Sequence, residues 1–312
     1  GALFVLIYIA FLLLLGLPVM TMELSVGRAS QRSIASSFDK LEKPGQKWHL
    51  HGYVALVANF LLMMFYTSVT GWILHYFIQF LSGNMTGITN EASAAKFGEM
   101  LASPGINVGF VAIVVILGFL ILSFGLQKGV ERITKYMMIA LLLLMVILAV
   151  NSFTLDGAKE GLSFYLKPDF SKIDGNVVVG AMNQAFFTLS LGIGAMAIFG
   201  SYLNKDRALL GESVNVAILD TFVAITSGLI IFPACFAHNV QPDAGPNLIF
   251  ITLPNLFNDI AFGRVIGSFF FLFLSFAALS TVFAVFEAII ACTSDLTGWS
   301  RKKSSLINCI AM

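Results

Sequence analysis

The sequence has little charge for its length. Only 11% of its 312 residues are Asp, Glu, Lys or Arg, whereas 58% are hydrophobic and the mean hydropathy is +0.88. Soluble domains typically carry about 25% charged residues, so most of this chain is expected to lie in lipid. The net charge of +1 leaves no basic excess, and a nucleic-acid partner is therefore not expected.

Paired cysteines and enzyme signatures are also missing. Cys235, Cys292 and Cys309 have no paired spacing, so the sequence predicts neither a disulfide framework nor a metal cluster. No nucleophile–base pair or cofactor motif is present, and the Gly192–Gly194 stretch follows no strand that would make it a phosphate-binding loop. The sequence therefore argues against an enzyme.

Seven apolar segments are long enough to cross a bilayer, which takes about 20 residues. They are Ala2–Val26, Tyr53–Leu81, Val108–Phe124, Tyr136–Phe153, Val177–Leu203, Val214–Ala237 and Val265–Cys292. A truncated eighth segment begins near Leu306. We therefore expect an all-α integral membrane protein in which residues 1–312 form one transmembrane domain, incomplete at both ends.

Lys and Arg in the connectors indicate the orientation. The connectors after the first, third, fifth and seventh spans hold thirteen of these residues, and the alternate connectors hold five. The connectors after the first, third, fifth and seventh spans are therefore expected in the cytoplasm. The chain is expected to pass several times through the plasma (inner) membrane. The long connector His238–Gly263 holds Pro242, Pro246 and Pro254 around an apolar run, which favours a structured re-entrant loop.

Three ionisable residues fall within the expected spans, where an Asp at the helix centre costs about 2.5–3.5 kcal/mol. Asp220 is the only charge between Ser213 and Gln241, which favours coordination of an ion. Glu23 and Glu287 lie nearer the cytoplasmic ends of their spans. For these two, a structural pair or a hydrogen bond that ties helices together is favoured.

The fifth span carries a signal for a break. Gly192 and Gly194 each cost a helix interior about 1 kcal/mol, and the hydroxyls of Thr188 and Ser190 compete for backbone groups. Irregular backbone at membrane depth is tolerated where it lines a cavity, and a broken helix there indicates the binding site of a secondary transporter. The alternative is a small-residue packing face, which predicts a spacing of four rather than two.

Polar groups also occur in two other spans. Ser280 and Thr281 follow Ala277 closely, and their hydroxyls either bond back to the preceding turn or join the Ala277 carbonyl as hard oxygens suited to Na⁺. Tyr66, in the middle of the second span, needs a partner for its hydroxyl. That partner is either a protein group or a substrate carboxylate.

Together these elements resemble the neurotransmitter:sodium symporters. Residues 183–192, NQAFFTLSLG, resemble the broken sixth helix of that family. Residues 1–28, from GALF through GLP to ELSVGR, resemble its second helix, and residues 162–169, LSFYLKPD, resemble the outer loop of bacterial members. The resemblance covers the whole chain and implies a truncated LeuT-like inverted-repeat fold, from the second helix to the start of the ninth.

The resemblance also implies roles for particular residues. The substrate would bind Leu62, Tyr66, Val69, Phe187, Thr188, Ser190, Ile193, Thr281 and Val285. One Na⁺ would bind Thr188 and Asp220, and a second would bind Ala277, Ser280 and Thr281. Phe187 would form the outer gate, whereas Tyr202 and Asp295 would belong to the inner gate.

Two departures from the family pattern matter. Many members carry a neutral Asn at the position of Asp220 and obtain a negative charge from chloride or from a Glu one turn later. Here the later position is Ala224, so no chloride is expected. The family's first helix, which supplies ligands to both Na⁺ sites and to the substrate, is not in the sequence, and the 312-residue chain alone is not expected to transport.

The sequence therefore predicts sodium-coupled symport of a neutral, hydrophobic amino acid into the cell by alternating access. A proton-coupled transporter that uses Asp220 as the proton carrier is one alternative. A non-transporting amino-acid sensor or channel on the same scaffold is the other. The expected partners are the amino acid and the lipid bilayer, and the sequence predicts no particular oligomeric state.

Overall fold

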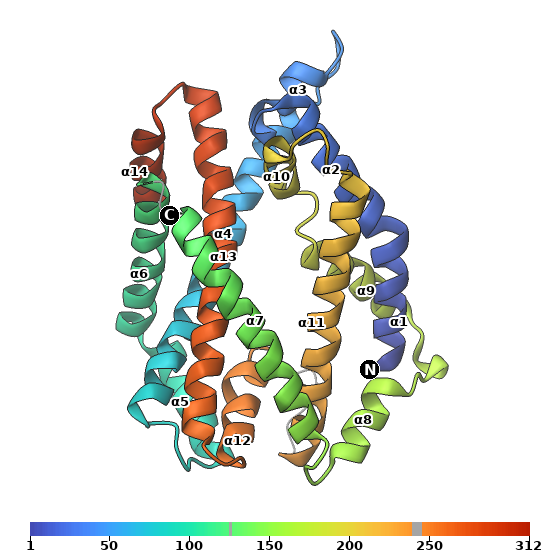
Figure 1. Ribbon diagram of the computed structural model, residues 1–312, viewed down its shortest axis with the longest axis vertical. Helices are drawn as coiled ribbons and strands as arrows, with labels where there is room; N and C mark the ends of the chain where they lie inside the picture. The colour runs from blue at the N-terminus through green and yellow to red at the C-terminus, as the bar shows by residue number, and fades with distance from the viewer. Residues whose placement is uncertain (125–126, 239–244) are drawn as a thin grey trace.

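The computed structural model describes residues 1–124, 127–238 and 245–312 (Figure 1). All regular secondary structure in these residues is helical. Six helical segments there are long and apolar enough to span a membrane. They are Ala2–Ser30, α4 (His49–Ser82), α6 (Pro104–Ser123), Arg132–Ser152 within α7 (Gln127–Ser152), α11 (Leu209–Ala237) and α13 (Gly263–Thr297). The first of these consists of α1 (Ala2–Phe11), a π-helical stretch (Leu12–Gly16) and α2 (Leu17–Ser30).

The fifth expected span is divided, as the sequence predicts. It consists of α9 (Gly175–Thr188) and α10 (Ala195–Tyr202), and residues 189–194 lie between them. The six continuous spans and this broken one make up the seven that were expected in the described residues. The partial eighth, α14 (Arg301–Ala311), begins five residues before the expected Leu306, because its first turn is polar and hydropathy does not detect it.

Shorter helices connect the spans. They are α3 (Ile34–Leu41), α5 (Asn90–Ala102), α8 (Ala158–Leu166), a 3₁₀ turn (Phe170–Lys172), a π-helical stretch (Leu248–Thr252) and α12 (Leu253–Asn258). The last two confirm that the connector after α11 is structured, and Phe250, Leu256 and Phe257 in it are buried. Pro254 lies in the first turn of α12, where its missing N–H leaves no bond unmade, whereas Pro242 lies outside the described residues.

The helices form two groups that α7 joins. One group contains α4, α6, α13 and α14, and the other contains α1, α2, α9, α10 and α11 (Figure 1). Helix α7 crosses between the groups and packs against both α11 and α13. The broken helix therefore belongs to one group, whereas Tyr66 on α4 and Ser280 on α13 belong to the other.

A glycine allows the second half of the broken helix to lie directly on α2. A Cβ added to Gly27 would lie 1.7 Å from the carbonyl oxygen of Ala197 on α10. Any larger residue would force the two helices apart. This contact fixes α10 against the segment that carries Glu23, one turn before Gly27.

Candidate functional site

The break between α9 and α10 is built from left-handed backbone. Ser190, Gly192 and Gly194 have φ angles of 53°, 88° and 73°. Two features require glycine at position 194. Its positive φ favours glycine, and an added Cβ would lie 2.3 Å from a side-chain carbon of Ile34. The break is therefore encoded in the chain at these positions.

A carboxylate accepts a hydrogen bond from one of the backbone N–H groups that the break frees. The amide of Gly192 donates to Oε1 of Glu23 at 2.6 Å. This is the helix-tying hydrogen bond that the sequence favours for Glu23. Arg28 donates instead to the carbonyl of Arg207 at 2.7 Å, and it forms no ion pair with Glu23 in the described part of the chain.

Asp220 on α11 meets the end of α9. The Thr188 hydroxyl donates to Oδ1 and Oδ2 of Asp220 at 2.8 and 2.9 Å. The Tyr8 hydroxyl donates to Oδ2 at 3.1 Å. The structure thus brings together Thr188 and Asp220, the residues expected for one Na⁺ site, and adds Tyr8, which the sequence analysis missed. The reasoning that singled out Tyr66, a polar ring within an apolar span, applies equally to Tyr8.

The second group of expected Na⁺ ligands is also clustered. The Ser280 hydroxyl donates to the carbonyl of Ala277 at 2.7 Å, so the back-bonding geometry is present and the two oxygens lie side by side. Tyr66 on α4 interacts with the side chain of Thr281 on α13. The Thr281 side chain therefore lies beside the Tyr66 hydroxyl.

A cavity of about 980 Å³ opens beside these groups. Five of the expected site residues line it: Ser190, Tyr202, Ser280, Thr281 and Val285. Leu62, Tyr66, Val69, Phe187, Thr188 and Ile193 are not in its lining. Phe187, the expected outer gate, is 60% exposed.

The expected inner-gate residues have separate partners. Tyr202 donates to Oε1 of Glu287 at 3.2 Å, and Arg301 donates to the same oxygen at 2.7 Å and also to Oε2. Asp295 instead accepts bonds from α3 and its N-cap, namely from the Ser33 amide at 2.9 Å and the Ser36 hydroxyl at 2.8 Å. Glu287 thus has the structural role that the sequence favours, with a partner on the following helix that the sequence did not identify.

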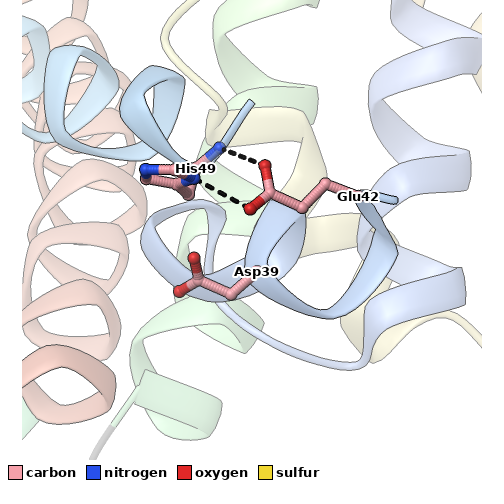
Figure 2. Close-up of side chains that lie close together, drawn as sticks. All are labelled: Asp39, Glu42 and His49. Carbon is pink, nitrogen blue, oxygen red and sulfur yellow. Dashed lines mark hydrogen bonds and ion pairs between the residues drawn. The ribbon is translucent and has the colours of Figure 1, made fainter. Parts of the chain in front are cut away.

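A second group of metal-ligand types, Asp39, Glu42 and His49, lies between α3 and α4 (Figure 2). Glu42 accepts hydrogen bonds from the backbone amide of His49 at 3.1 Å and from its Nδ1 at 2.8 Å. Desolvation of Glu42 opposes ionisation, but these bonds outweigh it and hold the pKa of this carboxyl below its usual value. Glu42 therefore serves as a cap for the first turn of α4.

The fold and the site define a multi-span transporter with a broken helix at its centre. The model of the sodium:neurotransmitter symporter family matches residues 1–97 and 91–312, and the chain belongs to that family. It is 35% identical over 305 residues to the uncharacterized sodium-dependent transporter YhdH of Bacillus subtilis (strain 168), a match that covers 98% of this chain and 67% of YhdH.

Two further similarities, one of sequence and one of structure, support this assignment. An uncharacterized sodium-dependent transporter of Haemophilus influenzae (strain ATCC 51907 / DSM 11121 / KW20 / Rd) is 32% identical over 316 residues, which cover 98% of this chain and 69% of that protein. The crystal structure of MhsT in complex with L-phenylalanine superposes with a TM-score of 0.94 at 39% identity, and the match covers 100% of this chain and 70% of MhsT. The expected LeuT-like fold, sodium dependence of the family and multi-pass membrane location are thereby confirmed, and the family is one of transporters rather than enzymes.

Proposed function

We propose that the protein carries a neutral, mainly apolar amino acid into the cell together with Na⁺, by alternating access and without chloride. The observation that carries this proposal is the bond from Thr188 to the Asp220 carboxylate at 2.8 and 2.9 Å. It places an ionisable oxygen pair beside the break in α9–α10, where freed backbone groups are available to ligands.

The donor set at Asp220 suits Na⁺. A carboxylate and a hydroxyl are hard oxygen ligands, and the negative charge of Asp220 balances one monovalent cation where the surroundings are apolar. Ala224, one turn further along α11, contributes no charge. Asp220 therefore supplies the charge that would otherwise come from a bound anion, which supports chloride independence.

A second Na⁺ fits the oxygens of Ala277, Ser280 and Thr281. All three are uncharged and hard, and those of Ala277 and Ser280 lie 2.7 Å apart. The three residues belong to one stretch of α13. Two Na⁺ ions per transport cycle is the stoichiometry that these two groups support.

The ends of the broken helix suit an amino-acid zwitterion. The C-terminal end of α9 at Thr188 carries partial negative charge and attracts an ammonium group. The Tyr66 hydroxyl is a donor for the carboxylate. Leu62, Val69, Ile193 and Val285 are apolar and hold the substrate side chain, and the capture of L-phenylalanine by the similar MhsT supports that assignment.

Proton coupling through Asp220 is the second candidate. Its carboxylate accepts bonds from two hydroxyls, those of Tyr8 and Thr188. Two donors stabilise the ionised, acceptor-only form of a carboxyl group. The relatives described as sodium-dependent transporters favour Na⁺ over a proton as the coupling ion.

Binding experiments distinguish dependence on sodium from dependence on chloride. Purified full-length protein is titrated calorimetrically with L-phenylalanine in sodium chloride, sodium gluconate and choline chloride at one pH. We expect binding in both sodium salts and none in choline chloride. Binding in choline chloride would contradict sodium coupling, and binding in sodium chloride but not in sodium gluconate would contradict chloride independence.

A further inference from the structure

Asn59 links α4 to the break in the neighbouring helix. Its side-chain Nδ2 donates to the carbonyl of Ala55 at 2.8 Å and to the carbonyl of Ile193 at 2.8 Å. Asn59 is only 1% exposed, and Ile193 lies 134 positions away in the chain. The bond therefore joins the two groups of helices at the level of the break.

The Ile193 carbonyl lies outside α10, whose N-cap is Gly194. It therefore falls among the backbone groups that the break removes from the regular helical pattern, and a buried carbonyl requires a partner. The amide of Asn59 supplies that partner. Among the described residues, no other side chain donates to this oxygen.

Asn59 lies on the substrate side of α4. Leu62 follows it by three positions and Tyr66 by seven, so all three share one face of the helix. Asn59 is the member of this row nearest the start of α4, the end expected to face the cytoplasm. A shift of Asn59 is therefore transmitted to the residues proposed to hold the substrate.

The other end of the same side chain is costly to bury. Oδ1 of Asn59 is buried, and no group among the described residues donates a hydrogen bond to it. An unpartnered buried acceptor destabilises the folded state, and an apolar residue of similar shape would avoid that cost. Packing alone thus does not account for an amide here, whereas the bond to Ile193 does.

We propose that Asn59 is a positioning residue of the transport site. Its amide holds the Ile193 carbonyl and thereby sets the conformation of the break and the place of the Ile193 side chain in the substrate pocket. The part of this inference that concerns the pocket rests on the proposed function. The part that concerns the break does not.

Asn59→Leu tests the inference, with Thr67→Val as the matched control. Thr67 is on the same helix and is equally buried, but its hydroxyl bonds only to Met63 of its own helix, at 2.7 Å. In full-length protein without substrate, hydrogen exchange of residues 187–197 is measured by mass spectrometry. We expect exchange about three- to tenfold faster in Asn59→Leu, corresponding to one lost hydrogen bond, and no change in Thr67→Val.

Substrate selectivity provides the second readout. Asn59→Leu should weaken binding of L-leucine and L-phenylalanine by different factors, because Ile193 moves relative to side chains of different size. A purely structural loss would lower both affinities equally. Asn59→Ala serves as a second variant if the leucine variant does not fold.

The outcomes are distinct. Unchanged exchange of residues 187–197 in both Asn59 variants would overturn the inference. Faster exchange in a protein whose wild type binds no amino acid would support Asn59 as the anchor of the break and refute the proposed function. Faster exchange with equal loss of both affinities would overturn the claim about the pocket.

Discussion

Thr188 donates its hydroxyl to both carboxylate oxygens of Asp220, at 2.8 and 2.9 Å, although 32 residues separate them in the sequence. The contact joins the last residue of α9 to the middle of α11. It places the only charge of that helix interior at the point where the broken helix stops. An ion bound there would hold α9 and α11 together and fix the backbone at the start of the break.

Replacement of Asp220 by Asn tests the source of the balancing charge. The neutral side chain keeps the shape but leaves the cation without a counter-charge, so we expect little sodium-dependent uptake in chloride-free medium and partial recovery when chloride is added. Uptake by proteoliposomes in sodium gluconate and sodium chloride provides the measurement. Normal uptake in gluconate would show that another group balances the ion.

Tyr8→Phe removes a bond to the same carboxylate. The Tyr8 hydroxyl donates to Oδ2 of Asp220 at 3.1 Å and orients it. We expect the apparent affinity for Na⁺ to fall about tenfold, as for loss of a hydrogen bond to a charged group. Tyr165→Phe is the control, because that hydroxyl bonds to the Ile225 carbonyl, at 3.3 Å, rather than to Asp220. Equal effects of the two substitutions would argue against a role for Tyr8 at the ion.

Tyr66→Phe should weaken substrate binding while the protein remains folded. A hydrogen bond to a charged group contributes about 1.5–3 kcal/mol, equivalent to about 10- to 150-fold in affinity. Calorimetric titration with L-phenylalanine measures the loss, and the melting temperature without substrate reports the fold. An unchanged affinity would place the substrate carboxylate elsewhere.

The substrate should be neutral and mainly apolar. Leu62, Val69, Ile193 and Val285 offer no side-chain hydrogen bond, and a charged side chain among them would be buried without a partner. Leucine, methionine, phenylalanine and tryptophan should therefore compete for uptake more strongly than lysine or glutamate. Strong competition by either charged amino acid would overturn the assignment of these four residues.

Much of the fold could be predicted because lipid imposes simple rules. Apolar length locates the continuous spans, and the glycines of residues 192–194 locate the break. Several helices begin before the apolar runs, α4 at His49 rather than Tyr53 and α7 at Gln127 rather than Tyr136, because a helix continues into the polar interface. Hydropathy detects only its apolar part.

The sequence singled out Asp220 and Glu287 but not their hydrogen-bond partners. Asp220 stands out as a lone charge, whereas Tyr8, a polar ring within an apolar span like Tyr66, carries no indication in the sequence that Asp220 is its partner. Glu287 was expected to have a structural role, yet only the folded chain places Arg301 beside it. Asn59 is also polar within an apolar span, but the sequence does not indicate the carbonyl, 134 positions away, to which it donates.

Sodium-gradient-driven uptake tests the central claim most directly. Full-length protein is reconstituted into proteoliposomes, and uptake of radiolabelled L-phenylalanine is followed with external Na⁺ or choline at the same pH inside and outside. We predict accumulation above equilibrium with an inward Na⁺ gradient and none with choline. Accumulation in choline when an inward proton gradient is imposed, with no effect of Na⁺, would contradict the account and assign Asp220 to proton transfer.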